Sequence, residues 1–249
     1  MTHNSSPVAV TEALVRANQH WQQRRQSEEG ARERPACPAF SIALSREAGT
    51  YGAAIAREAG NRLGWPVYDR ELLQSIADDL GVHQTLLASV DERHANWLSR
   101  CLEGFSDGGG VNQYAYVRRL VDTLLALAAR GECVVVGRGA TKVFPAATTV
   151  RVRIVAPLEH RIQAVRREHG ISREEAEHRV EATDRERDAF VREHFDVDAK
   201  DPRNYDLVLN AARFSVGQCA ELIIAALERL RADPAPSAVA QAKETLSAV

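Results

Sequence analysis

Short apolar runs alternate with amphipathic stretches along most of the chain. The apolar or alternating runs predict five strands, over residues 39–44, 65–68, 133–136, 150–154 and 206–210. Apolar positions three and four residues apart predict helices between them, over residues 53–63, 70–80, 117–129, 158–193 and 216–230. Strands that alternate with helices are typical of a mostly parallel sheet covered on both faces. We therefore expect an α/β fold.

The fourth predicted helix contains a break at Gly170-Ile-Ser172. Ser172 and Glu175 have the spacing of a capping box, so a second helix is expected to begin there. In the fourth predicted strand, Arg151 and Arg153 alternate with apolar residues. We expect that strand to have one polar or charged face.

Segments at both ends of the chain fall outside this pattern. Residues 1–37 hold apolar positions at helical spacing followed by a polar, proline-bounded stretch, which predicts an amphipathic helix and a linker. That helix is expected to pack on the core or on a second subunit, which would give a homodimer. Residues 38–231 form the predicted domain, and residues 232–249, rich in Ala, Pro and Ser, are expected to be a mobile tail. Residues 91–112 are irregular and contain three consecutive glycines, typical of a hinge or a loop tip.

Composition and charge exclude several classes of function. The 249 residues are 45% hydrophobic and carry a formal net charge of −2, which gives no general attraction to nucleic acid or to anionic membranes. No apolar run approaches the ~20 residues of a membrane span. The four cysteines lie far apart without metal-ligand spacing, and the first residues contain no apolar core of a signal peptide. We expect a cytoplasmic protein that binds neither nucleic acid nor membranes.

The first predicted strand runs directly into Ser45-Arg-Glu-Ala-Gly-Thr-Tyr-Gly52, and a helix follows. A strand, a glycine-bearing turn and a helix N-terminus can form an anion site, because backbone N–H groups and the helix dipole face the ligand. The pattern also fits an ordinary connecting turn. A full P-loop, GxxxxGK[ST], would have a lysine and a hydroxyl after the turn. Here Gly52 stands at the lysine position and Ala53 and Ala54 at the hydroxyl positions, and none of the three lysines of the chain lies close in sequence.

Four more short sequence motifs follow this loop along the chain: Tyr68-Asp-Arg70, Val134-Val-Val-Gly-Arg-Gly-Ala140, Thr183-Asp-Arg-Glu-Arg187 and Tyr205-Asp-Leu-Val-Leu-Asn210. Together with the loop, they make residues 40–228 resemble the cytidylate kinase-like family. The resemblance implies a P-loop NTPase-type three-layer fold with a mostly parallel sheet, an acceptor-binding segment and a helical lid over about residues 157–203. It implies transfer of the γ-phosphoryl group of ATP to a nucleoside monophosphate such as CMP, or to a similar phosphate acceptor, with Mg²⁺. Two departures are Tyr51, where the family usually has glycine, and Gly139, where cytidylate kinases have an aspartate that holds the acceptor sugar.

The resemblance also implies roles for individual residues. The donor phosphates would be bound by Arg46, Gly49, Thr50 and Gly52, with Arg46 supplying the charge of the absent lysine. Thr50 is the nearest hydroxyl for a metal-bound water, and no metal ligand is assigned. The acceptor would be held by Asp69, Arg70 and Arg138, and the donor base would contact Asn210. The lid residues are Arg161, Arg166, Asp184, Arg187 and Arg192, and the residues expected to act in catalysis are Arg46, Asp69 and Arg187.

Structural roles compete with these assignments. Asp69 has the position of a helix N-cap, the lid arginines fit a solvated helix face with i,i+4 ion pairs, and Asn210 is a turn former. The missing lysine and hydroxyl also fit a protein of another class. That protein would be a non-catalytic nucleotide sensor or regulator with the same fold, whereas Arg138 and the lid arginines favour an enzyme.

Overall fold

Strand β1 (Ser41–Arg46) lies at the centre of a five-stranded sheet. The computed structural model of the protein describes residues 40–78 and 111–232, and in it the strand order is β2-β3-β1-β4-β5 with every pairing parallel. The other strands are β2 (Val67–Tyr68), β3 (Val134–Val136), β4 (Thr149–Val155) and β5 (Leu207–Asn210). The prediction of a mostly parallel sheet is confirmed.

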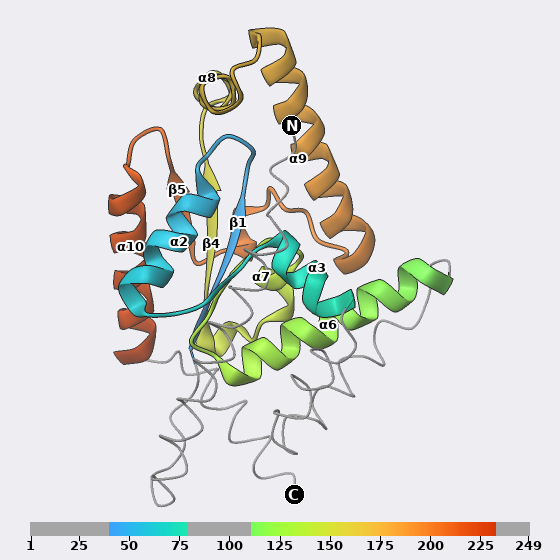
Figure 1. Ribbon diagram of the computed structural model, residues 1–249. Coiled ribbons are helices and arrows are strands. Elements are labelled where there is room, and N and C mark those ends of the chain that lie inside the picture. Colours follow the sequence, from blue (N-terminus) through green and yellow to red (C-terminus); the bar gives the residue numbers. More distant parts are fainter. Residues whose placement is uncertain (1–39, 79–110, 233–249) are drawn as a thin grey trace, which may run out of the picture.

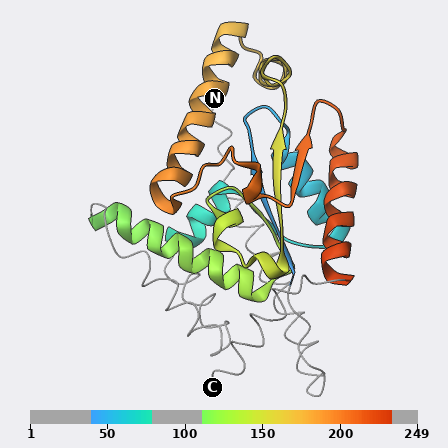
Figure 2. The same ribbon diagram turned by 180° about the vertical axis from the view of Figure 1, so that it is seen from behind.

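Helices cover both faces of this sheet and complete a three-layer α/β fold. Helices α2 (Gly52–Leu63) and α10 (Val216–Ala232) pack side by side on one face. Helices α3 (Arg70–Asp78), α6 (Val111–Arg130) and the short α7 (Ala140–Val143) lie on the other face, as Figures 1 and 2 show from opposite sides.

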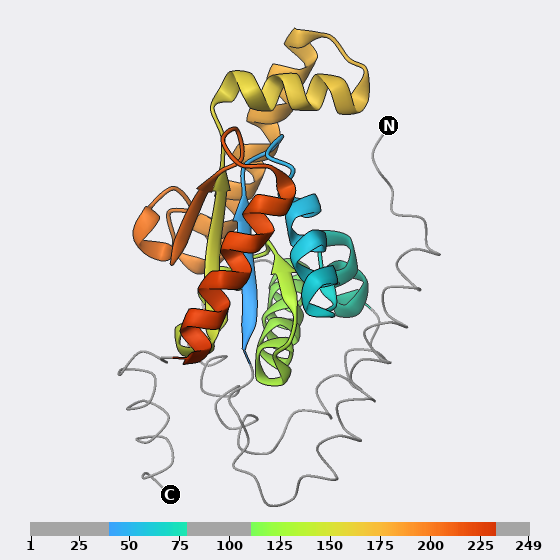
Figure 3. The same ribbon diagram turned by 90° about the vertical axis from the view of Figure 1, so that its left-hand side faces the viewer.

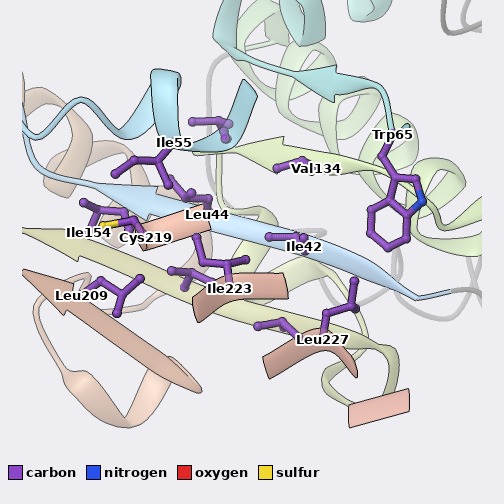
Figure 4. Close-up of a cluster of buried hydrophobic side chains, with 14 of the residues drawn as sticks. Ile42, Leu44, Ile55, Trp65, Val134, Ile154, Leu209, Cys219, Ile223 and Leu227 are labelled. Carbon is purple, nitrogen blue, oxygen red and sulfur yellow. The ribbon is translucent and has the colours of Figure 1, made fainter. Parts of the chain in front are cut away.

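The alternation of side chains along β1 builds the two halves of the core. Ile42 and Leu44 point to the face of α2 and α10, where Figure 4 shows them with Ile55 and Ile223. Ala43 points to the opposite face and packs against α3 and α6 residues. Each large aliphatic side chain that is fully buried stabilises the fold by about 1.5–3 kcal/mol. Because both faces of a central parallel strand are buried, its sequence is a nearly continuous apolar run, and this made β1 easy to predict.

Two helices stand beyond the carboxyl ends of the strands. Helix α8 (Leu158–His169) follows β4, and helix α9 (Arg173–Phe195) returns beside the sheet (Figures 1 and 3). The predicted capping box is confirmed, since the Ser172 hydroxyl accepts a hydrogen bond from the Glu175 N–H and the Glu175 carboxylate accepts one from the Ser172 N–H. At its far end α9 packs Phe195 against Leu125 of α6. The α8–α9 pair is thus joined to the rest of the domain at both ends.

The structure differs from the predicted elements in a few places. Strand β2 has only two residues, and α7 and the 3-10 turns Ala146–Thr148 and Pro202–Asn204 were not predicted. In β4, Arg151 and Arg153 alternate with apolar residues as expected, but Arg153 is only 7% exposed. Its guanidinium donates a hydrogen bond of 2.7 Å to the Ser45 hydroxyl on the neighbouring strand, and this pairing replaces water.

Several predictions concern residues outside the described ranges. These are the N-terminal helix and linker, most of the irregular stretch over residues 91–112, and the tail after residue 232. Among the helices of residues 40–78 and 111–232, not one combines the length and the apolar character that a bilayer crossing requires.

Candidate functional site

The loop between β1 and α2 lies at the carboxyl edge of the sheet. Gly49 and Tyr51 both have left-handed backbone conformations, with φ of 75° and 55°. The Thr50 side chain is fully buried, and its hydroxyl donates a hydrogen bond of 2.8 Å to the Glu47 carbonyl oxygen. The loop is therefore a tight turn that ends at the N-terminus of α2, and the Thr50 hydroxyl is engaged inside it.

The α8–α9 pair is docked directly on this loop. The Asp184 carboxylate accepts a hydrogen bond of 2.7 Å from the backbone N–H of Ala48. Arg161 donates to the other carboxylate oxygen of Asp184 and lies 3.4 Å from the Glu47 carboxylate. A Cβ at Gly49 would lie 2.5 Å from the Arg161 carbonyl oxygen, so only glycine allows this close approach. Asp184 and Arg161 thus occupy the outer side of the loop.

Arg46 crosses the inner side of the loop. A Cβ at Gly52 would lie 2.7 Å from the Arg46 Cβ and 2.8 Å from its Cγ, and a Cβ at Gly137 would collide with Nη1 of Arg46. The side chain therefore runs over the start of α2 and ends beside the β3 terminus. Its pKa is lowered to about 9, because burial removes water from the guanidinium and the positive charges of Arg187 and Arg138 add to the effect.

Arg187 and Arg138 reach the same region from different elements. Arg187, on α9, donates a hydrogen bond of 3.4 Å to the Arg46 carbonyl oxygen, and burial lowers its pKa. Arg138 follows β3 with a left-handed φ of 53°, an unfavourable conformation for a residue with a side chain. Its guanidinium lies over the Phe190 ring, 4.7 Å from the centroid, and burial also lowers its pKa.

These arginines line one cavity of about 70 Å³ at the sheet edge, together with Arg70, Arg153 and two acidic residues, Glu186 and Asp188. Asp188 is paired with Lys200 at 3.3 Å. Arg70 is paired with Glu186 at 2.8 Å. Among the residues that the structure describes, no carboxylate lies within ion-pair distance of Arg46, Arg138 or Arg187. Acidic residues such as Asp69 and Glu71 act on Arg46 only from beyond ion-pair distance, so three mostly buried guanidinium groups at one place favour the binding of an anion. The cavity is therefore a candidate anion site.

The structure divides the residues that the sequence predicted as site residues. It brings Arg46, Arg70, Arg138 and Arg187 to the cavity. It joins Arg161 and Asp184 at the loop, whereas Arg166 and Arg192 are exposed and do not line the cavity.

Two of the predicted residues have the structural role that competed with the functional one. The Asp69 Oδ1 accepts a hydrogen bond of 3.2 Å from the Leu72 N–H and so caps α3, although its charge still acts on Arg46. The Asn210 Oδ1 accepts one of 3.0 Å from the Ala212 N–H within a turn.

Sequence reasoning missed several residues at this edge. Arg153 was expected only on a polar or charged face of its strand, and its pairing opposite Ser45 in the β1–β4 register places it at the cavity. Glu47 was quoted only as part of the loop, yet its carboxylate accepts a hydrogen bond of 3.2 Å from the Ala156 N–H and so ties the loop to the start of α8. Phe190 had no distinguishing signal, because its role depends on α9 returning to the end of β3.

The donor set fits a phosphate group better than a protein-held metal ion. Backbone N–H groups at a helix N-terminus and unpaired arginines suit phosphate oxygens. Within residues 40–78 and 111–232, no three acidic, histidine or cysteine side chains gather closely enough to hold a metal. The Thr50 side chain is fully buried inside the turn, and alanines stand at the hydroxyl positions of the P-loop pattern, so this loop does not present the hydroxyl that a full P-loop offers to magnesium.

Comparisons with known proteins identify the family of the chain. The cytidylate kinase of Methanopyrus kandleri is 34% identical over 92 residues, which are 36% of this chain and 48% of that protein, so the match spans about half of the relative's length. A solved structure of an uncharacterized protein from Eubacterium ventriosum superposes with a TM-score of 0.58 at 18% identity, covering 76% of this chain and 98% of that one. Shikimate kinase from Bacteroides thetaiotaomicron gives 0.42 at 14% identity with the same coverage. The model of the cytidylate kinase-like family matches residues 41–213, and the chain belongs to that family.

Proposed function

We propose that the protein is a nucleotide-dependent phosphotransferase that moves the γ-phosphoryl group of ATP to a nucleoside monophosphate or a similar phosphate acceptor. The family supports a kinase-like function in general terms. The observation that carries the finer proposal is the set of three arginines, Arg46, Arg138 and Arg187, that share a cavity beside the loop and, within the described residues, form no ion pair with a carboxylate. Such a set matches the charge that a phosphoryl group spreads over its oxygens during transfer.

The proposed reaction needs positioning and charge neutralisation more than covalent chemistry. In this proposal the loop N–H groups bind the donor phosphates, and Arg46 lies between the loop and the acceptor side. Arg138 and Arg187 bind the acceptor phosphate from the end of β3 and from α9. The α8–α9 pair acts as the lid and excludes water from the cavity. ATP supplies the phosphoryl group when it is bound.

A non-catalytic nucleotide sensor is the second candidate. Two observations favour it: the Ala48 N–H is already bonded to Asp184, and the hydroxyl positions of the P-loop are alanines. A sensor would keep the anion site and would not need to orient an attacking phosphate.

One experiment separates the two candidates. The purified protein is incubated with ATP, magnesium chloride and each nucleoside monophosphate in turn, while ADP release and equilibrium ATP binding are measured in parallel. ADP release that depends on one acceptor supports the phosphotransferase. ATP binding without turnover for any acceptor supports the sensor, and absence of ATP binding refutes both.

A further inference from the structure

Arg46 and Gly52, at the two ends of the loop, occupy two positions whose residue types are fixed in a full P-loop. When GxxxxGK[ST] is laid on residues 46–53, Arg46 takes the place of the first glycine and Gly52 the place of the lysine. We propose that these positions have exchanged roles, so that Arg46 is the donor-phosphate cation and Gly52 is glycine because the Arg46 stem fills its side-chain space. The phosphate part of this proposal rests on the proposed function, and the spatial part does not.

The spatial part follows from the contacts at Gly52. The atoms that would crowd a side chain there are the Arg46 Cβ and Cγ, at 2.7 and 2.8 Å from the position of the new Cβ. They belong to the root of the arginine side chain, which cannot swing away as its end could. Gly52 is not among the described glycines with positive φ, so its backbone conformation does not require glycine. Space alone explains this glycine, and a lysine there is incompatible with Arg46.

The charge part follows from where the guanidinium ends. The Arg46 side chain reaches Gly137 at the end of β3, in the same cavity as Arg138 and Arg187. An arginine kept only for structure would be expected to pair with a buried carboxylate, yet the described part of the chain gives Arg46 no such ion pair. The charge lies between the loop N–H groups and the acceptor-side arginines, where a cation would contact a phosphoryl group in transit.

The role of Arg46 is tested first by removing its charge alone. Arg46→Met keeps the stem over Gly52, and it is expected to weaken ATP binding about 10- to 100-fold, the loss of one or two charge-assisted hydrogen bonds. Its melting temperature should not fall, because the charge that it removes is buried and unpaired. Arg57→Ala, an exposed arginine on α2, serves as the control and should bind ATP like the wild type. Unchanged ATP affinity in Arg46→Met overturns the phosphate role.

The exchange itself is tested by swapping the two residues. Gly52→Lys alone should lower the melting temperature by about 4–8 °C, because the new side chain overlaps the Arg46 stem. The double variant Arg46→Gly/Gly52→Lys should recover most of that loss and bind ATP at least 10-fold more tightly than Arg46→Gly. A double variant that melts no higher than Gly52→Lys overturns the spatial exchange.

The melting experiment needs no ligand, so it remains decisive if the proposed function fails. Wild-type protein that binds no ATP would overturn the proposed function and the phosphate role together. Wild-type binding that is equal in Arg46→Met would overturn only the phosphate role.

Discussion

The carboxylate of Asp184, on helix α9, accepts a hydrogen bond from the backbone N–H of Ala48, in the loop after β1. An anionic group of the protein therefore lies on a loop N–H that a donor phosphate is proposed to use. Arg161 holds the carboxylate in place and is itself bonded to the Ala156 carbonyl oxygen at 3.0 Å. The Asp184 carboxylate and a donor phosphate would therefore compete for one hydrogen-bond donor.

Removal of the Asp184 carboxylate is expected to strengthen ATP binding. In Asp184→Ala the Ala48 N–H becomes available and Arg161 loses the Asp184 carboxylate, so affinity should rise about 5- to 30-fold, or roughly 1–2 kcal/mol. Titration calorimetry with ATP measures the change. Glu181→Ala, an exposed acidic residue of α9, is the control for net charge. Weaker binding in Asp184→Ala would instead make Asp184 a supporting residue of the site.

Gly139 is expected to tolerate no side chain. It has a left-handed φ of 76°, and a Cβ there would overlap the Phe195 ring. Gly139→Ala should therefore lower the free energy of unfolding by about 2–4 kcal/mol, part from backbone strain and part from the collision. Urea unfolding measures this loss. The aspartate that cytidylate kinases have at this position has no room here.

Gly170 provides the matched control for that prediction. It also has a left-handed φ, of 64°, but nothing lies within 4 Å of an added Cβ. Gly170→Ala should cost only the backbone part, about 1 kcal/mol. If Gly139→Ala and Gly170→Ala lowered the free energy of unfolding equally, the Phe195 ring would have to move away from the new methyl group without loss of stability.

The pH dependence of stability should report the buried charge of Arg46. The folded pKa of about 9 lies below the ordinary arginine value, so the unfolded chain binds more protons above pH 9. The free energy of unfolding should therefore rise with pH above 9, as folded Arg46 loses its proton. Below pH 9 the buried guanidinium stays charged and lowers the free energy of unfolding by its full amount. The difference in unfolding free energy between wild type and Arg46→Met, measured from pH 7 to pH 10.5, isolates this effect from other groups. A difference that stays constant across the range would contradict it.

Two arginines of the same helix should differ sharply in their effect on turnover. Arg187 lines the cavity and contacts the Arg46 carbonyl oxygen, whereas Arg192 lies five residues further along α9 and is exposed. Arg187→Met should lower kcat/KM for the identified acceptor about 10²- to 10³-fold, the typical loss of one donor to a developing charge. Arg192→Met should leave it unchanged. Similar losses in both variants would point to a general effect of the charge of α9.

Much of the fold could be predicted because its signals are local. The apolar strand at residues 133–136 and the capping box at Ser172 depend on neighbours in sequence, and both were recognised. The burial of Arg153 could not be recognised in the same way, because it depends on the register that sets it opposite Ser45. The left-handed backbone conformation of Arg138 could not be predicted either, because arginine has no preference for positive φ.

The site was predicted in part for the same reason. Arg46 lies three residues before Gly49 at the end of one strand, and Arg138 lies between two glycines at the end of another; both patterns are visible in sequence, and both side chains reach the cavity. The bond between Asp184 and Ala48 joins residues 136 positions apart, and no local pattern predicts such a contact. Arg166 and Arg192 were included because the segment is rich in arginine, but a helix directs only some of its side chains toward the sheet.

The central place of β1 has a consequence for how the chain folds. Ile42 pairs with Val134 on one side and with Val150 on the other, so β1 is synthesised well before either of its neighbouring strands. At synthesis rates of about 5–20 residues per second, β1 stays without its β4 partner for on the order of 5–20 s. During that time an apolar strand has both edges open, which favours association with other chains. Nascent chains that stop before β4 should therefore depend on chaperones, and full-length chains should refold more slowly than helical proteins of similar size.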